Sequence, residues 1–271
     1  VAFTSAKPEG PWSSGTTSEA NSFSVQGRMS MLDRYVGAGI PPEKLIVGVG
    51  CCAFTDTVRL AAHAAQLGCG GVLMLPPFYY KAVTDEGIFR AVAETIERVR
   101  DDRLRVYLYH IPPIAQVGYS IPLVERLVNI FPQTVVGLKD SSGDWSYLSA
   151  VLDKFLGFGT FAGSEKFLLQ TLRMGGAGTI SAMANIIPAQ IRYLYDHWQK
   201  PEAERVQDEL NIMRAALQKY PTVPALKQII ARWRSDPEWA NVRPPFVRMT
   251  HAEAEEMLAS VPVVATLAAM Q

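Results

Sequence analysis

The chain has 271 residues, 48% of them hydrophobic and 19% charged, which suits one large α/β domain or a barrel with a helical appendix and excludes a disordered chain. The 26 basic and 26 acidic residues cancel without long runs of one sign, so we expect neither nucleic acid nor a membrane surface as a partner. No apolar run approaches the roughly 18 residues of a membrane span.

The amino terminus shows no basic-then-apolar signal pattern, so a cytoplasmic protein is expected. Three cysteines, Cys51, Cys52 and Cys69, lack the spacing of a zinc site, and an odd number is a poor disulfide framework. We interpret them as reduced, mostly buried thiols.

Apolar, β-rich runs alternate with helical patterns along most of the chain. Strands are predicted at 1–5, in the stretch entering Gly15, and at 45–50, 71–75, 105–110, 135–139, 159–162 and 177–181. Helices are predicted at 57–67 (capped by Asp56), 85–100, 122–131, 146–155 and 166–174. Such alternation indicates parallel strands joined by right-handed crossovers, so the fold class is α/β, with a (β/α)8 TIM barrel over residues 1–188.

Two features modify this barrel. The strand pattern stops at Ala189, and residues 189–271 are predicted to form a C-terminal helical region, with helices at 190–198, 203–220, 225–233 and 252–258. Between the first two strands only residues 6–12 remain, whereas a parallel crossover needs roughly ten or more residues. We therefore expect that a crossover helix is missing, either deleted from the chain or unseen in its structure.

Lys139 ends the apolar run 134–138 and is followed at once by the polar residues 140–144. The run is typical of a strand buried on both faces, where a lysine is costly unless its ammonium reaches an open end or sheds its proton. A neutral amine can attack a carbonyl and form a Schiff base. The alternative is a lysine paired with a local carboxylate such as Asp140.

Other polar residues follow the predicted strands, and active sites of β/α barrels lie at these carboxyl ends. Thr16 and Thr17, beside Gly15, present hydroxyl and backbone donors suited to a small carboxylate, although they also fit an ordinary helix cap with Glu19. Tyr109 is a candidate proton carrier near Lys139; the alternative is a half-buried barrel tyrosine.

His110 should point to the opposite face of its strand from Tyr109 and pack toward a helix. No convergent set of metal ligands and no glycine-rich phosphate loop is present in the sequence, so neither a metal nor another cofactor is expected.

Taken together, the strand ends resemble those of the pyruvate-dependent class I aldolases, the family of dihydrodipicolinate synthase and N-acetylneuraminate lyase. The motifs are GTTSE (15–19), PFYY (77–80), YHIP (109–112), GLKD (137–140) and AGSE (162–165), in the same order across nearly the whole chain. The resemblance implies a (β/α)8 barrel that assembles as a homo-oligomer, a dimer or tetramer, and needs no metal or organic cofactor.

By this resemblance, Lys139 forms the imine with a 2-oxo acid, usually pyruvate. Thr16 and Thr17 match the pair that binds its carboxylate. Tyr109 matches the tyrosine that relays the proton. Tyr79, rather than the tyrosine after it, looks like the residue lent across the dimer interface.

Four further residues match substrate-binding positions of the family. Gly163 and Ile180 correspond to backbone positions around the imine, and Glu165 and Ser181 stand where the sugar-acid lyases of the family hold substrate hydroxyls. One departure is Ser18, which stands where the family usually has glycine and so constrains that loop.

The expected function is an aldolase or lyase that joins pyruvate to an aldehyde, or cleaves a 2-oxo-3-deoxy sugar acid. A Schiff-base dehydratase of a keto-deoxy sugar acid is the first alternative, and a non-catalytic, metabolite-binding homologue is another. Dihydrodipicolinate synthesis is disfavoured because residues 113–117 contain no arginine to hold the carboxylate of a second substrate.

Overall fold

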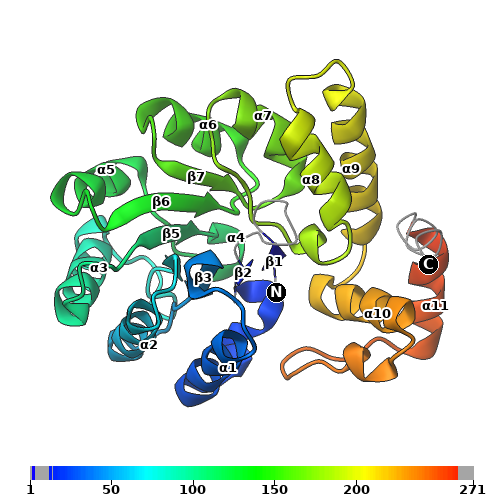
Figure 1. Cartoon of the computed structure of the whole chain (residues 1–271), viewed down its shortest axis with the longest axis horizontal. Coiled ribbons are helices and arrows are strands. Elements are labelled where there is room, and N and C mark those ends of the chain that lie inside the picture. Colours follow the sequence, from blue (N-terminus) through cyan, green and yellow to red (C-terminus); the bar gives the residue numbers. More distant parts are fainter. Residues whose placement is uncertain (1, 4–11, 14, 262–271) are drawn as a thin grey trace.

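The structure is a computed structural model that describes residues 2–3, 12–13 and 15–261, the first two pairs by their backbone alone (Figure 1). Its strands are β1 (Ala2–Phe3), β2 (Trp12–Ser13), β3 (Leu45–Gly48), β4 (Gly71–Met74), β5 (Val106–His110), β6 (Val135–Asp140), β7 (Gly159–Ala162) and β8 (Gly178–Thr179). They form one sheet in chain order.

The helices that accompany the sheet are α1 (Val25–Gly37), α2 (Phe54–Gln66), α3 (Asp85–Val99), α4 (Pro112–Ala115), α5 (Ile121–Ile130), α6 (Trp145–Lys154) and α7 (Leu168–Arg173). After the last strand come α8 (Pro188–His197), α9 (Ala203–Leu217), α10 (Thr222–Arg234) and α11 (His251–Ser260). Short 3-10 helices lie at Thr16–Ser18, Ala20–Ser22, Pro42–Lys44, Glu165–Phe167, Ala182–Asn185 and Pro237–Ala240.

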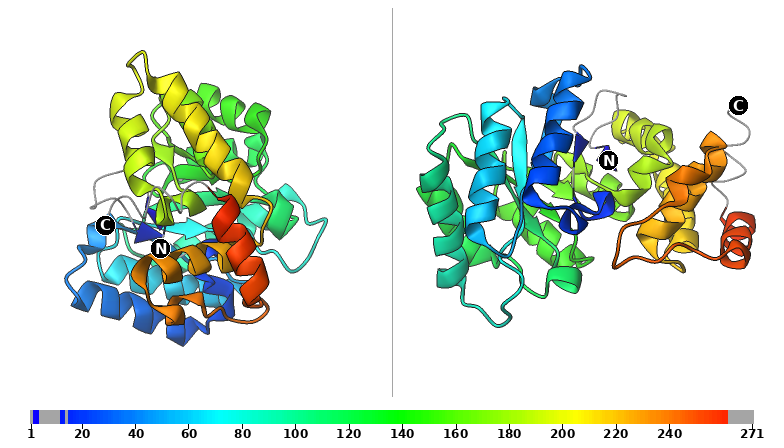
Figure 2. Two further views of the ribbon diagram at one scale, coloured as in Figure 1. Left: turned by 90° about the vertical axis from the view of Figure 1, so that its right-hand side faces the viewer. Right: turned by 90° about the horizontal axis from the view of Figure 1, so that it is seen from below.

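The predicted α/β alternation is confirmed from residue 45 onward. Strands β2 to β8 pair in parallel, and each connection between them contains a helix. Figures 1 and 2 show the sheet curling, with α1, α2, α3 and α5 on its outer side and the C-terminal helices gathered at one end. This is the strand–helix arrangement of a β/α barrel.

The first strand differs from the prediction. β1 pairs with β2 in antiparallel fashion, and the described part of the chain shows no pairing between β1 and β8. The predicted parallel start of the sheet is therefore wrong. The reason is chain length, because eight residues separate β1 from β2 and a parallel return needs about a dozen. The stretch 6–12, in which we expected the crossover helix to be missing, lies outside the described residues except for Trp12.

The two faces of the sheet bury different side chains. Val47, Val72, Val106 and Leu138 join the large cluster that packs under the helices. The residues that alternate with them, Ile46, Leu73, Tyr107 and Tyr109, form a separate cluster on the inner face. Because side chains alternate along a strand, this division fixes which residues reach the interior of the curled sheet.

The first described helix, α1, was not predicted. Its start is nevertheless visible in the sequence, because Ser24 is the N-cap and accepts a hydrogen bond from the Gly27 N–H at 3.0 Å. The predicted Asp56 cap is wrong. Helix α2 begins at Phe54, so Asp56 lies in its first turn. There its negative charge interacts favourably with the positive end of the helix dipole.

Helices α8 to α11 follow the sheet, as predicted. Their apolar residues share one cluster with α7, including Leu169, Leu194, Leu210 and Met257. The boundary at residue 188 between barrel and helical region stays a prediction. No helix within the described residues has the length and apolar character needed to span a membrane. The cysteine prediction holds in part: Cys69 is buried and Cys51 is half-buried, but Cys52 is exposed.

Candidate active site

Lys139 lies at the carboxyl end of β6, between two parallel neighbours. It is in register with Tyr109 of β5 on one side and with Phe161 of β7 on the other. Its Nζ atom lies 4.2 Å from the centroid of the Tyr109 ring, and the residue is 7% exposed. The predicted buried lysine beside a tyrosine is thus what the fold produces, because both side chains face the interior.

The floor beneath Lys139 is aromatic and depends on a glycine. A Cβ atom at Gly137 would lie 2.3 Å from the Tyr107 ring, so a side chain there would displace that ring. Tyr107 in turn packs against Phe161, with ring centroids 5.9 Å apart. Gly137 therefore makes room for a hydrophobic floor, which keeps the space below the amine apolar.

Tyr109 connects Lys139 to the Thr16 loop. The Tyr109 hydroxyl lies 3.2 Å from Thr16 Oγ1, and it also hydrogen bonds to Lys139 and Ser141. Burial raises the pKa of Tyr109, but the charge of Lys139 and these hydrogen bonds together outweigh it, so the pKa lies below its ordinary value. A phenol of this kind releases its proton more readily than a free tyrosine.

Ser141 is a site residue that the sequence analysis missed. Its position gives a signal, because it lies two residues after Lys139 and so shares the same face of the extended chain. Gly163, at the end of β7, approaches it closely: a Cβ atom at Gly163 would lie 2.0 Å from Ser141 Oγ. Glycine at 163 therefore lets the ends of β6 and β7 come together beside the hydroxyl.

The helix-cap alternative for Thr16 and Thr17 is not what the structure shows. Both lie within the 3-10 helix Thr16–Ser18, which has no side-chain cap. Thr16 faces Tyr109, while Thr17 contributes to a cavity on the other side of the loop. Glu19, with φ 55°, is the residue of this loop whose backbone is in the left-handed region, and Ser18 is not. Carboxylate binding by Thr17 stays a prediction.

A buried arginine stands behind the Thr16 loop and was also missed. The Arg28 Nη2 atom donates to the Gly48 carbonyl at 2.6 Å, and Nη1 donates to the Gly50 carbonyl at 3.4 Å. Burial lowers the pKa of Arg28, and the thiol of Cys51 opposes that effect. A small cavity of about 20 Å³ lies between Arg28, Thr16 and Tyr109. A buried guanidinium held by two backbone carbonyls thus stands at this end of the sheet.

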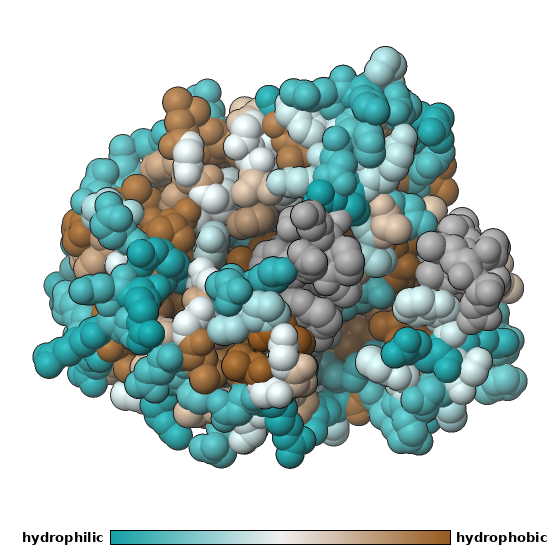
Figure 3. All heavy atoms as spheres, viewed as in Figure 1, coloured by the Kyte–Doolittle hydropathy of each residue, from teal (hydrophilic) through white to brown (hydrophobic). Residues whose placement is uncertain are grey.

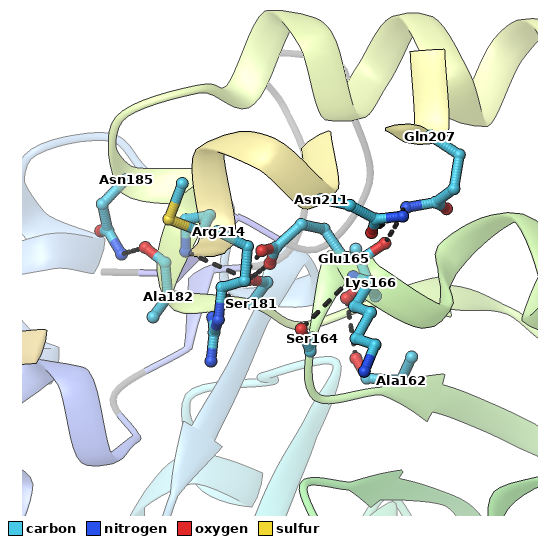
Figure 4. A network of polar contacts seen from close by, with 12 residues as sticks. Ala162, Ser164, Glu165, Lys166, Ser181, Ala182, Asn185, Gln207, Asn211 and Arg214 are labelled. Atoms are coloured by element: carbon cyan, nitrogen blue, oxygen red, sulfur yellow. Dashed lines mark hydrogen bonds and ion pairs between the residues drawn. The ribbon is translucent and has the colours of Figure 1, made fainter. Parts of the chain in front are cut away.

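Glu165 and Ser181, at two neighbouring strand ends, are in contact, while their predicted binding of substrate hydroxyl groups stays a prediction. Ser181 Oγ donates to Glu165 Oε2 within a fully buried network (Figure 4). The second oxygen, Oε1, lies 3.7 Å from Arg214 Nη1 of α9. Figure 4 shows Gln207, Asn211 and Arg214, all from α9, beside Glu165, so this residue links the ends of β7 and β8 to α9.

Further members of the network come from α9 and escaped the sequence analysis. Gln207 Nε2 donates to the Glu165 carbonyl at 3.0 Å and to Asn211 Oδ1 at 3.1 Å. Arg214 Nε is buried and has no hydrogen-bond partner in the described residues. Polar residues at 207, 211 and 214 share one helical face, which is the signal in the sequence. Ile180, next to Ser181, is fully buried, and its N–H donates to the Ala162 carbonyl at 2.9 Å.

The outer face of the same strands holds His110 and Asp140. His110 stacks on Tyr147 with centroids 4.0 Å apart, and its Nδ1 accepts from the Tyr119 N–H at 2.9 Å. The prediction that His110 packs toward a helix is confirmed. Asp140 is paired with His110 in the sheet and accepts from the Ser142 N–H at 2.9 Å. It faces away from Lys139, so the alternative Lys139–Asp140 ion pair does not form.

The charges on that outer face are strongly perturbed. Burial lowers the pKa of His110 to about 4, against a weaker opposing effect of Asp144. Burial raises the pKa of Asp140 to about 6, although hydrogen bonds from Ser142 lower it. The Asp140 Oδ2 atom has no hydrogen-bond partner in the described part of the structure, consistent with a carboxyl that prefers to be neutral.

Tyr79 and Tyr80 lie on the loop after β4, away from this cluster. Each is 72% exposed, and their rings meet edge to face with centroids 5.3 Å apart. Lys81 anchors the loop by donating to the Phe78 carbonyl and, at 2.9 Å, to the Ala115 carbonyl. An exposed aromatic pair is compatible with the predicted role of Tyr79 in a partner subunit, which stays a prediction.

The residues at these strand ends define a class of site: a buried amine, a tyrosine of lowered pKa and a threonine hydroxyl at the carboxyl edge of a parallel sheet. Such sets suit covalent catalysis on a carbonyl compound. Among the described residues, no group of three His, Cys, Asp or Glu side chains is placed to hold a metal.

The chain belongs to the dihydrodipicolinate synthetase family, which it matches over residues 6–262. It is 32% identical over 250 residues to an uncharacterized DapA-like lyase of Chloroflexus aurantiacus, a match covering 91% of this chain and 82% of the relative. The family predicted from the strand ends is thereby confirmed.

Solved structures agree on the fold. Dihydrodipicolinate synthase from Agrobacterium tumefaciens superposes with a TM-score of 0.82 at 29% identity, covering 91% of this chain and 84% of the other. YagE, a prophage protein of the dihydrodipicolinic acid synthase family from E. coli K12 in complex with pyruvate, gives 0.81 at 22% identity, covering 94% and 85%.

Proposed function

We propose that this protein is a lyase that forms a Schiff base between Lys139 and a 2-oxo acid, with pyruvate as the keto acid. The observation that carries the proposal is the contact of the buried Lys139 amine with Tyr109, whose hydroxyl bonds to Thr16. Pyruvate is chosen because the structurally similar YagE was solved with it.

The proposed reaction begins with a proton transfer, because an ammonium has no lone pair with which to attack. Tyr109 is within hydrogen-bonding reach of Lys139, and in its phenolate form, which the lowered pKa favours, it accepts this proton. The freed amine attacks C2 of pyruvate, and a proton passes from the nitrogen to the former carbonyl oxygen to give a carbinolamine. The Tyr109 phenol then gives its proton to the carbinolamine hydroxyl, which leaves as water and leaves a protonated imine.

The imine acts as an electron sink for the next bond change. Loss of a proton from C3 gives an enamine, whose carbon attacks the carbonyl carbon of an aldehyde; cleavage of a 2-oxo-3-deoxy sugar acid is the same step in reverse. Hydrolysis of the imine releases the product and the free amine. Thr16, with Thr17, would hold the carboxylate so that C2 stays near Lys139.

For the aldehyde we propose a hydroxylated rather than an acidic compound. No arginine occurs between Pro113 and Val117, so the clamp for a second carboxylate is lacking there. Glu165 and Ser181 lie at the adjoining strand ends, buried and bonded to each other, and they would bind substrate hydroxyl groups once that hydrogen bond opens. Gly163 and Ile180 would line the imine, and Tyr79 would complete the site in a dimer or tetramer.

The test is reductive trapping. Incubation with pyruvate and borohydride should add the mass of a reduced pyruvyl group to the peptide that contains Lys139, because hydride reduces the imine to a stable amine. Lys139→Arg should show no adduct, whereas Lys166→Arg, at an exposed lysine in the 3-10 helix after β7, should label like the parent protein. Labelling that survives Lys139→Arg would refute the proposal.

The product distinguishes the reaction class. Pyruvate release from a panel of 2-oxo-3-deoxy sugar acids would identify an aldolase. Consumption of the same compounds without pyruvate release would identify the dehydratase alternative. Failure to turn over any of them, with intact trapping at Lys139, would leave the imine in place and point to a non-catalytic, metabolite-binding role.

A further inference from the structure

Glu165 is a fully buried residue that uses only one of its two carboxylate oxygens in a hydrogen bond. Ser181 Oγ donates to Oε2, whereas Oε1 is buried and has no hydrogen-bond partner among the described residues. A buried polar atom without a partner costs free energy. A second conformation of this side chain, in which Oε1 is paired, would therefore be stabilised if a donor lies within reach.

Arg214 of α9 is placed to be that donor. Its Nη1 atom lies 3.7 Å from Glu165 Oε1, beyond hydrogen-bonding distance, and its Nε atom is buried without a partner in the part of the chain that the structure describes. A hydrogen bond between a guanidinium and a carboxylate spans about 2.8 Å, so a movement of the carboxylate by about 1 Å would complete it. Figure 4 shows Arg214 and Ser181 both next to this carboxylate, so it has two alternative partners.

The main chain at Glu165 is held in place by the same helix. Gln207 of α9 donates from Nε2 to the Glu165 carbonyl at 3.0 Å, and its Oε1 atom accepts from the Leu169 N–H at 3.0 Å. This one buried side chain thus ties the 3-10 helix Glu165–Phe167 and the start of α7 to α9. A change of partner by the Glu165 carboxylate is therefore a rotation of the side chain and needs no movement of the backbone.

Ser181 has no proton to offer a ligand while it is bonded to Glu165. A serine hydroxyl carries one proton, and Ser181 donates it to Glu165 Oε2. The same Oγ atom accepts from the Met183 N–H at 3.1 Å, because Ser181 is the N-cap of the 3-10 helix Ala182–Asn185. The cap fixes the position of the hydroxyl, so its proton becomes available to a substrate only when Glu165 turns away.

We propose that Arg214 is a positioning residue that determines the preference for hydroxylated aldehydes, an inference that rests on the proposed lyase function. When such an aldehyde enters, the Glu165 carboxylate turns toward Arg214, and a substrate hydroxyl takes the vacated place. That hydroxyl accepts from Ser181 and donates to Glu165, so both carboxylate oxygens are then paired. An aldehyde without the hydroxyl would leave Ser181 and Glu165 unpaired, and a site of this kind discriminates against it.

The experiment measures the two halves of the reaction separately. Exchange of the C3 protons of pyruvate for deuterium, followed by NMR in heavy water, reports the imine and the enamine and needs no aldehyde. Addition of glyceraldehyde, or of propionaldehyde with the same carbon skeleton and no hydroxyl, then measures bond formation at saturating pyruvate. We expect kcat/KM of the parent protein to be about 100-fold higher for glyceraldehyde, as for a hydrogen bond to a charged group.

Replacement of Arg214 should reduce this preference and leave the pyruvate half of the reaction intact. In Arg214→Met the preference for glyceraldehyde should fall about tenfold, while the rate of proton exchange stays within a factor of about two of the parent value. Arg214→Gln, which keeps hydrogen-bond donors but not the charge, should show the same loss and serves if the methionine variant does not fold. Arg214→Lys should restore most of the preference, because a cation again faces the carboxylate.

Two further variants give the experiment its controls. Arg205 lies on the same helix, is exposed and pairs with Glu209, and Figure 3 shows mainly hydrophilic side chains on the surface over α9. Arg205→Met should change neither the preference nor the exchange rate. Glu165→Gln should lower the preference by about the same factor as Arg214→Met. The double variant should lose no more than either single one, because Arg214 acts through Glu165.

The outcomes separate this inference from the proposed function. An unchanged preference in Arg214→Met, or additive losses in the double variant, would overturn the role of Arg214 while the exchange in the parent protein still supports the lyase. A parallel loss of exchange and preference in Arg214→Met would overturn it as well, since the residue would then be merely structural. Absence of exchange in the parent protein would refute the lyase itself and the inference with it.

Discussion

The two faces of β5 and β6 differ in chemistry although their residues alternate in the same strands. On the inner face, Tyr109 and Lys139 lie in register, exchange a hydrogen bond and meet the Thr16 loop. On the outer face, His110 and Asp140 lie in register one residue further, under Tyr147 and away from the interior. The alternation of side chains along each strand is thus enough to place two of these four ionisable groups on each face of the sheet.

The difference teaches that burial of an ionisable group does not by itself mark a catalytic one. The outer pair has large pKa shifts caused by burial, and its partners are backbone groups and a stacked ring. The inner pair is joined by a hydrogen bond to Thr16 of a neighbouring loop. Both pairs lie at the carboxyl ends of β5 and β6, and what separates them is the face of the sheet: the inner pair faces the interior of the curled sheet, and the outer pair faces the helices.

The strongest test of the comparison removes the inner amine. Lys139→Met should lower kcat by about four orders of magnitude, because no other group at the site can form the imine. The free energy of unfolding should stay the same or rise, since a buried charge is replaced by an apolar chain of similar length. Steady-state kinetics and urea unfolding measure the two effects.

The control for this change is Lys166→Met, which alters an exposed lysine close to the same strand ends. It should leave kcat within a factor of two or so of the parent value, as expected for a surface substitution. Comparable loss of activity in both variants would mean that general positive charge, rather than the Lys139 amine, supports the reaction.

Removal of the inner phenol should have the next largest effect. Tyr109→Phe keeps the ring beside Lys139 but loses the proton carrier, and kcat should fall by about two to three orders of magnitude. Tyr107→Phe is matched to it, because Tyr107 lies two residues earlier on the same face. Tyr107→Phe should keep nearly full activity. The pH dependence of kcat should change in Tyr109→Phe alone.

The outer face should respond to pH through stability. The pKa of His110 falls from 6.5 to about 4 in the folded state. Its contribution to the free energy of unfolding is therefore fully present above pH 6.5 and is lost as the pH falls toward 4. The pKa of Asp140 rises from 3.8 to about 6, so its contribution is present below pH 3.8 and is lost as the pH rises through 6. Between about pH 4 and pH 6 the two residues change the free energy of unfolding in opposite directions, each by about 3 kcal/mol in all.

Asp140→Asn removes one of the opposing trends. Between pH 6.5 and pH 4, its free energy of unfolding should fall by about 3 kcal/mol more than that of the parent protein, because the His110 contribution is no longer balanced. Urea unfolding at intervals of pH measures this slope, with Asp208→Asn on the exposed side of α9 as the control. Parallel slopes in parent and variant would show that the outer pair does not titrate as described.

The smallest expected effect concerns the loop. Thr16→Val keeps the shape of the side chain but loses the hydrogen bond to Tyr109, and kcat/KM should fall about tenfold, the value of one hydrogen bond near a charged group. Serine at this position should restore most of the activity. If valine has no effect, the loop positions neither the phenol nor the substrate.

The sequence predicted much of this arrangement because the position of a residue along a strand determines the face on which its side chain lies. The β-branched run before Lys139 and the alternation through Tyr109 and His110 place each side chain on its face without reference to the rest of the fold. Ser141 could have been found by the same parity. These inferences are local, which is why they succeeded.

Other features depend on contacts between distant segments and could not be read in that way. The antiparallel β1–β2 pair follows from a short connection, but its direction is decided by pairing in space. Arg214 reaches Glu165 from a helix 49 positions later in the chain, and helical periodicity gives its face but not its partner. Helix α1 was overlooked because polar residues and Gly27 interrupt its apolar pattern.

Glu19 adds a consequence for how this protein can be altered. Its carboxylate pairs with Lys227 of α10 and accepts from the Arg243 N–H at 2.6 Å, so residues more than 200 positions away tether the end of the Thr16 loop. The last third of the chain therefore helps to hold the Thr16 loop in place. Trimming it, or exchanging it for that of a relative, would remove the contacts that hold Glu19 and would release the loop that carries Thr16.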